Sequence, residues 1–112
     1  MKISTTNYGN VWALRVDRSI LQENVPVLRE RLSALIGEGK IRIVVDLSGA
    51  SYLSSLGVAV IVDAKNRIAE AGGNLRLACV NQLIYNLLDI TNLTKQLEIF
   101  DTVDEAVQSF ET

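Results

Sequence analysis

The chain has 112 residues, of which 48% are hydrophobic and 21% are charged, and its formal net charge is −2. This length predicts a single domain over residues 1–112, large enough to bury a core without disulfides or metals. The slightly acidic balance, with lysine and arginine scattered among acidic residues, argues against a nucleic-acid partner held by phosphate contacts.

The residue types that most often carry catalysis or bind metals are scarce in this chain. It has no histidine, which excludes a Ser–His–Asp or Cys–His mechanism and removes the commonest zinc ligand. Its single cysteine, Cys79, lies in the apolar run LRLACV and is predicted to be a buried strand residue. A lone cysteine fits a reducing compartment, and no stretch resembles a signal peptide or a membrane span. We therefore expect a cytoplasmic protein with no metal, no cofactor and no direct membrane insertion.

Strands and helices are predicted to alternate along the whole chain from the spacing of its apolar residues. In chain order we expect strands at 2–6 and 11–16, a helix at 25–36, a strand at 41–47, a helix at 55–71, a strand at 74–80, a short helix at 83–88, a strand at 97–100 and a helix at 103–110. The first two strands form a hairpin, so the sheet cannot be wholly parallel. The order predicts an α/β fold with a mixed sheet of four to five strands and about four helices packed on it.

The stretch YLSSLGVAV, residues 52–60, contains two serines where the helix at 55–71 begins. A serine at the N-cap satisfies a free backbone N–H and is worth about 1 kcal/mol, which explains Ser54 or Ser55 but not both. The free N–H groups and partial positive charge of a helix start also favour an anion. A phosphorylated serine would be stabilised there, and its charge would disturb a docking surface.

The same helix is apolar on more than one side. The residues predicted to pack on the sheet are Gly57, Ile61, Ala64 and Ile68. Val58, Ala59 and Val62 lie off this face, so the first two turns are apolar nearly all round. Either a neighbouring helix covers the extra side, or that side is a surface for a partner protein.

Asp17 follows directly after the strand at 11–16, and Asp46 lies at the end of the strand at 41–47. An acid–base pair of these residues would be the enzymatic interpretation. An aspartate at a strand end more often accepts backbone N–H groups from the next loop, and we expect this role for Asp46.

The segment IVVDLSGASYLSSLGVAVIVDAKNRIAEAGGNLRLACV resembles the STAS domain, the fold of the anti-sigma factor antagonists. The features shared with that family are the strand end Asp46-Leu47-Ser48, the pair Tyr52-Leu53, the helix start Ser54-Ser55-Leu56-Gly57 and the turn Gly72-Gly73. The later stretch LLDITNLTKQLEIFDTVDEAVQSF is similar to the end of the family's domain. The resemblance extends from about Lys40 to Phe110.

The resemblance implies a binding protein with no catalytic residues, regulating transcription through an anti-sigma factor or a serine kinase. In this family the kinase phosphorylates a serine or threonine directly before the motif glycine, and a serine phosphatase reverses the reaction. That position is Leu56 here, which cannot be phosphorylated. Ser55 and Ser54 remain as candidate phosphorylation residues, and Leu56 is expected to enlarge an apolar docking patch with Val58 and Val62.

The family also places the loop around Asp17 and Ser19 near the same docking face, although a solvated turn is an equally good interpretation of that loop. The predicted partner-binding residues are Asp17, Ser19, Asp46, Ser54, Ser55, Leu56, Gly57, Val58 and Val62. Single STAS domains also resemble the accessory subunits of lipid-transport ATP-binding-cassette complexes, which is the alternative function.

Overall fold

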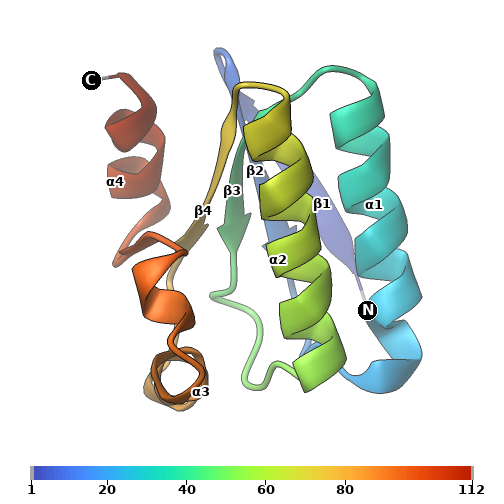
Figure 1. Cartoon of the computed structure of the whole chain (residues 1–112), viewed down its shortest axis with the longest axis vertical. Helices are drawn as coiled ribbons and strands as arrows, with labels where there is room; N and C mark the ends of the chain where they lie inside the picture. Colours follow the sequence, from blue (N-terminus) through green and yellow to red (C-terminus); the bar gives the residue numbers. More distant parts are fainter. Residues whose placement is uncertain (1, 112) are drawn as a thin grey trace.

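The sheet is built from an antiparallel hairpin followed by parallel strands, and the computed structural model describes it within residues 2–111 (Figure 1). The strands are β1 (Ile3–Tyr8), β2 (Val11–Val16), β3 (Arg42–Asp46), β4 (Asn74–Ala78) and β5 (Ile99–Phe100). They lie in the order β1-β2-β3-β4-β5, and every pair after β1–β2 is parallel. The predicted mixed sheet with an N-terminal hairpin is therefore confirmed.

Four α-helices connect and follow the strands in the described part of the chain, as the apolar spacing predicts. They are α1 (Val25–Gly37), α2 (Ser55–Glu70), α3 (Gln82–Ile90) and α4 (Val103–Gln108). Short 3-10 turns at 22–24, 93–95 and 109–111 complete the connections. None of the helices within residues 2–111 is long and apolar enough to cross a membrane.

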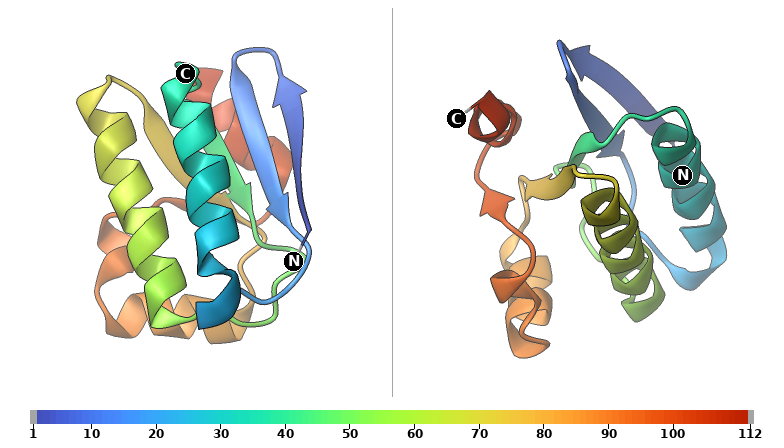
Figure 2. Two further views of the ribbon diagram at one scale, coloured as in Figure 1. Left: turned by 90° about the vertical axis from the view of Figure 1, so that its right-hand side faces the viewer. Right: turned by 45° about the horizontal axis from the view of Figure 1, so that its top comes forward.

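Helices cover both faces of the sheet, which explains why its central strand β3 is buried over four of its five residues. α1 and α2 lie side by side on one face, and α4 lies on the other (Figure 2). Successive strand residues point to opposite faces, so Leu14 of β2 joins the large core under α1 and α2. Its neighbour Ala13 joins a smaller core with Ala106 of α4. The central strand β3 contributes to both cores, as predicted for a strand covered on both faces.

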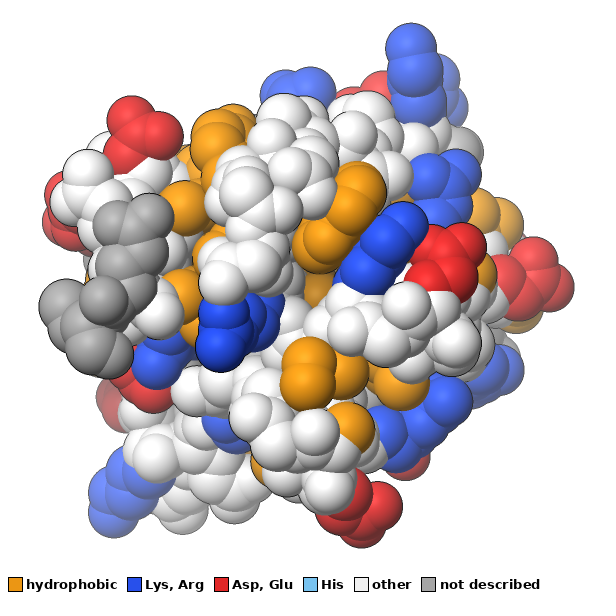
Figure 3. All heavy atoms as spheres, turned by 90° about the horizontal axis from the view of Figure 1, so that it is seen from above, with side chains coloured by type: hydrophobic (Ala, Val, Ile, Leu, Met, Phe, Trp, Pro, Cys, Tyr) orange, Lys and Arg blue, Asp and Glu red, His pale blue; other side chains and the backbone are white. Residues whose placement is uncertain are grey.

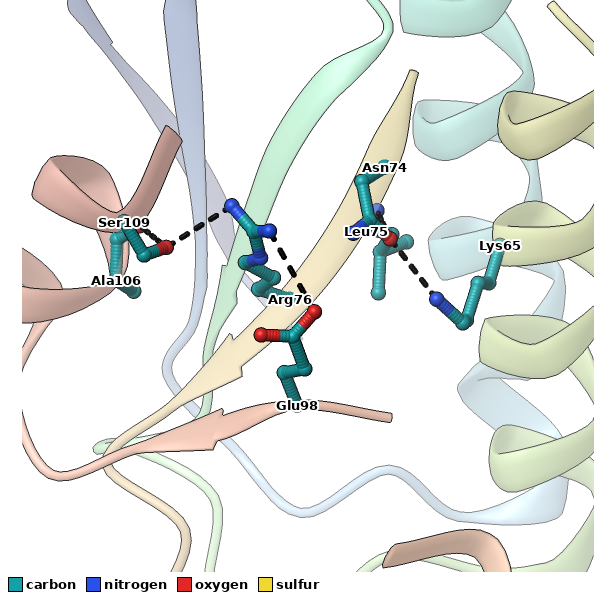
Figure 4. A network of polar contacts seen from close by, with 7 residues as sticks. All are labelled: Lys65, Asn74, Leu75, Arg76, Glu98, Ala106 and Ser109. Atoms are coloured by element: carbon teal, nitrogen blue, oxygen red, sulfur yellow. Dashed lines mark hydrogen bonds and ion pairs between the residues drawn. The ribbon is translucent and has the colours of Figure 1, made fainter. Parts of the chain in front are cut away.

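The turn after α4 is tied to the sheet by Arg76 of β4 (Figure 4). Its guanidinium donates a hydrogen bond of 3.0 Å to the Ser109 hydroxyl and lies 3.4 Å from a carboxylate oxygen of Glu98. The same group stands 4.2 Å from the ring centroid of Phe110. The Arg76 side chain is only 15% exposed, so these contacts neutralise and hold a largely buried cation at the edge of the smaller core.

The end of the molecule that carries the β1–β2 turn shows no concentration of one charge. Figure 3 shows lysine and arginine side chains spread over this face among acidic and uncharged ones. At this end, Lys40 lies 4.0 Å from the ring centroid of Trp12, so the tryptophan is used in a local cation–π contact.

Candidate functional site

The loops that follow β2 and β3 meet at the carboxyl edge of the sheet, at the lower end of Figure 1. Ile20 and Leu53 form an isolated parallel bridge between the two loops. The Ile20 N–H donates to the Tyr52 carbonyl at 2.9 Å, and the Ser54 N–H donates to the Ile20 carbonyl at 2.8 Å. This edge also receives the loop after β4, because the Asn81 side-chain amide donates to the Ser51 carbonyl at 3.1 Å. Segments far apart in the sequence thus form one surface.

Ser19 holds these two loops together through its hydroxyl. The Tyr52 N–H donates to the Ser19 Oγ at 3.0 Å, and the Ser51 hydroxyl lies 2.7 Å from the same atom. The backbone approaches closely as well, because a Cβ added at Gly49 would lie 2.6 Å from the Cα of Asp17. The loop around Asp17 and Ser19 therefore packs directly against the loop that leads into α2.

The two carboxylates that end β2 and β3 each bind backbone. Asp46 is buried and accepts a hydrogen bond of 2.9 Å from the Ser48 N–H, which confirms the predicted loop-holding role. Asp17 accepts from the Lys2 N–H at 2.8 Å and so fixes the start of β1. Arg15 lies 3.9 Å from Asp46 and supplies the nearest countercharge.

The prediction that Cys79 is a buried strand residue is wrong. β4 ends at Ala78, and Cys79 is half-buried with a left-handed backbone, φ 60°. Its N–H donates to the Phe100 carbonyl at 3.0 Å and so continues the β4–β5 pairing, while the left-handed backbone at Cys79 turns the chain away from the sheet. Burial and the nearby Asp46 carboxylate raise the pKa of the Cys79 thiol, so the thiol is kept protonated near neutral pH. Within residues 2–111, no cluster of cysteine and acidic side chains is placed to hold a metal ion.

The two serines at the start of α2 have different environments. Ser54 is the N-cap, and its hydroxyl accepts a hydrogen bond of 3.1 Å from the Gly57 N–H, as predicted for one of the pair. Ser55 is the first helical residue and is exposed. In the described part of the chain its hydroxyl has no hydrogen-bond partner, so it is available to another molecule.

Gly57 is buried where α2 begins, and its lack of a side chain allows the helix to rest on the loop bridge. A Cβ at this position would lie 2.7 Å from both Ile20 Cγ2 and Leu53 Cδ1. Gly57 is one of the predicted partner-binding residues, but it is buried beneath the surface, on the face of α2 that is predicted to pack on the sheet. Its lack of a side chain lets α2 pack closely on the Ile20–Leu53 bridge, and this packing fixes the position of Leu56.

The surface around the start of α2 is apolar. Leu56 and Tyr52 are each 44% exposed, and Leu56 is the second residue of the helix. Val58 and Val62 are half-buried and line a groove of about 460 Å³ between α2 and α3. The prediction that a neighbouring helix covers this side of α2 is confirmed in part, because α3 lies beside it but leaves the groove open.

The helix α3 adds exposed apolar residues that the sequence analysis did not identify. Leu83 is 57% exposed and Ile90 is 80% exposed, while Leu87 lines the groove. Only Ile84 and Leu88 of this helix are buried. The sequence QLIYNLLDI carried the signal, because it is apolar on more sides than one packing face requires.

Comparison with known proteins identifies the family. The model of the STAS domain family matches residues 2–106. The anti-sigma-B factor antagonist of Staphylococcus epidermidis is 26% identical over 99 residues, covering 88% of this chain and 92% of that protein. A provisionally named anti-sigma factor antagonist of Thermotoga neapolitana is 30% identical over 73 residues, a stretch that spans 65% of each chain, just under two thirds of the relative's length.

The fold agrees with a solved structure of the same kind. The crystal structure of a provisionally named anti-sigma factor antagonist of Thermotoga maritima superposes with a TM-score of 0.94 at 23% identity, covering 98% of this chain and 95% of that one. At this level of identity the likeness shows the fold. With the family match over residues 2–106, the chain therefore belongs to the STAS domain family and is similar to its anti-sigma factor antagonists.

Proposed function

We propose that this chain is an anti-sigma factor antagonist that acts as a single STAS domain in the cytoplasm. It binds an anti-sigma factor, or a serine kinase that serves as one, and so releases a sigma factor. It acts by binding and not by catalysis. The names of its relatives support the class of partner, and the exposed apolar start of α2 supports the place of contact.

The observation that carries the proposal is the position of Leu56. It stands directly before Gly57, where the family has its phospho-acceptor, and 44% of it is exposed in the first turn of α2. A leucine there cannot take a phosphate, and burying its side chain against a partner would contribute about 1–2 kcal/mol. We propose that Leu56 anchors the partner and that docking is not switched at this residue.

Of the two serines, Ser55 is the one that suits phosphorylation. The Ser54 hydroxyl is engaged in the helix cap, whereas the Ser55 hydroxyl is exposed at the mouth of the groove between α2 and α3. A phosphate on Ser55 would be stabilised by the free N–H groups of the first helical turn. It would also place up to about two negative charges beside an apolar docking surface, which would end binding.

The test is capture of partners from lysate of the native bacterium, followed by identification by mass spectrometry. Wild-type protein is expected to retain an anti-sigma factor or a serine kinase, and Leu56→Asp is expected to lose it. Val27→Asp is the matched control, because Val27 is also 44% exposed but lies on α1. Specific recovery of a transporter ATPase instead would support the accessory-subunit function and contradict the proposal.

Phosphorylation is tested separately on protein purified from the native cells. Mass spectrometry of the peptide that contains residues 54 and 55 is expected to place any phosphate on Ser55, with Ser55→Ala as the control. Phosphate on Ser54 would contradict the assignment, because the helix cap would then have to open.

A further inference from the structure

A continuous apolar strip runs along α3, beside the proposed antagonist surface. It consists of two adjoining hollows. One is the groove of about 460 Å³ between α2 and α3, lined by Val58, Val62, Leu87 and Leu93 among others. The other holds about 190 Å³ and is lined chiefly by Tyr52, Leu83, Leu87 and Ile90.

The shape of the strip suits an elongated apolar partner. Leu87 lines both hollows and forms the ridge between them. Leu83, Leu87 and Ile90 follow the spacing of one helix face, yet this face packs on no other element of the described chain deeply enough to bury Leu83 or Ile90. Two hollows in a row match two apolar side chains on one face of a partner helix.

We propose that this strip is a second docking site, and that its occupant is an amphipathic helix of another protein with lysine or arginine beside its apolar face. The charged side chain that lines the strip favours a partner helix with basic residues beside its apolar face. Asp63 lines the larger groove, and its carboxylate is 69% exposed with Arg67 only 4.0 Å away. Asp63 is the one charged residue among the described residues that line the two hollows. No lysine or arginine of the described residues is among those that line either hollow.

The same charge argues against the other occupants. In a symmetric pair of copies the same patch meets itself, so the Asp63 carboxylate would gain no countercharge from the lining residues of the second strip. An anionic membrane surface attracts basic segments and would be repelled by Asp63. A basic amphipathic helix satisfies both the apolar hollows and the acidic flank.

The strip extends beyond the function proposed above and can be tested apart from it. It shares Val58 and Val62 with the predicted partner-binding residues, but Leu56 lines neither hollow. A substitution at Leu56 therefore tests the antagonist surface, and substitutions at Leu83 or Ile90 test the strip.

The probe is a fluorescently labelled 14-residue peptide of leucine and lysine, with the leucines spaced along one helix face. Binding is measured by anisotropy, and its location by amide chemical-shift changes in labelled protein. We expect saturable binding with shifts concentrated on α2 and α3. Ile90→Asp and Leu83→Asp are both at exposed positions and should each weaken binding by about tenfold or more. Val27→Asp, at an exposed position on α1, should leave it unchanged.

Matched peptides and two further measurements decide among the occupants. A peptide with glutamate in place of lysine should bind at least about tenfold more weakly, and Asp63→Asn should reduce that difference. Equal binding of both peptides, or equal binding to wild type and Ile90→Asp, would overturn the proposal. It would also be overturned if sedimentation showed self-association that Ile90→Asp abolishes. Binding to vesicles of phosphatidylglycerol that depends on Ile90 would overturn it in favour of a membrane surface.

Discussion

Replacing Gly57 by alanine should lower the free energy of unfolding by up to about 2 kcal/mol, although alanine is the better helix former. In an open helical position, glycine to alanine stabilises by up to about 1 kcal/mol. At position 57 the new Cβ would lie 2.7 Å from Ile20 Cγ2 and 2.7 Å from Leu53 Cδ1. Both side chains have 0% exposure, so neither can move away into solvent. Overpacking of this kind costs about 1–3 kcal/mol, which exceeds the gain in helix propensity.

The matched control is Gly37→Ala at the end of α1. An added Cβ meets no atom within 4 Å there, so this change should stabilise the protein by about 0.4–1 kcal/mol. Both variants are compared with wild type by urea unfolding followed by circular dichroism. In thermal unfolding, each kcal/mol should shift the melting temperature by about 4 °C. The reasoning is refuted if the two alanines change stability in the same direction, because the contact with Ile20 and Leu53 would then have no measurable cost.

Three further predictions follow from the capping, acceptor and thiol positions. Ser54→Ala should lose about 1 kcal/mol with the helix cap, while exposed Ser55→Ala should stay within about 0.5 kcal/mol in the same urea assay; equal losses would contradict the cap. Leu56→Ser should be phosphorylated by a partner serine kinase in a phosphate-transfer assay. Absence of phosphate on the variant would contradict the assignment of position 56 as the acceptor position. Cys79 should be alkylated slowly at pH 8 and faster in Asp46→Asn, because burial and that carboxylate raise the pKa of the thiol. Because the pKa of the thiol is raised in the folded state, its contribution to stability is fully present below the pKa of unfolded cysteine, about 8.5, and is lost as pH rises through the folded pKa. The urea midpoint of the wild type should therefore fall over that pH range. The midpoint of Cys79→Ser should fall less.

The elements that could be predicted from sequence are those with strong local signals. Helix α2 combines an apolar face, a serine cap and a terminal Gly72-Gly73, and its observed start after Ser54 agrees with that pattern. The end of β4 could not be predicted in this way. The run LRLACV is apolar to its end, and the turn comes from a left-handed backbone at Cys79, a conformation that a cysteine in an apolar run does not indicate.

In the candidate site, too, the features that depend on neighbouring residues could be predicted, and those that depend on the assembled fold could not. The capping role of Ser54 and the loop contact of Asp46 follow from residues within three positions of each. The exposure of Leu83 and Ile90 depends on what covers α3, which is a property of the assembled fold. The burial of Gly57 follows from its place on the predicted packing face, but its close contact with Ile20 depends on how the connection after β2 folds against α2.

The bridge between Ile20 and Leu53 has a consequence for how fast and how tightly this surface binds. Its hydrogen bonds of 2.9 and 2.8 Å hold the two loops in one arrangement before any partner arrives. A surface that is already ordered loses little conformational entropy on binding. The amides of Ile20 and Ser54 should therefore exchange slowly with solvent even in the free protein. Differences in affinity among partners should then arise mainly from their rates of dissociation.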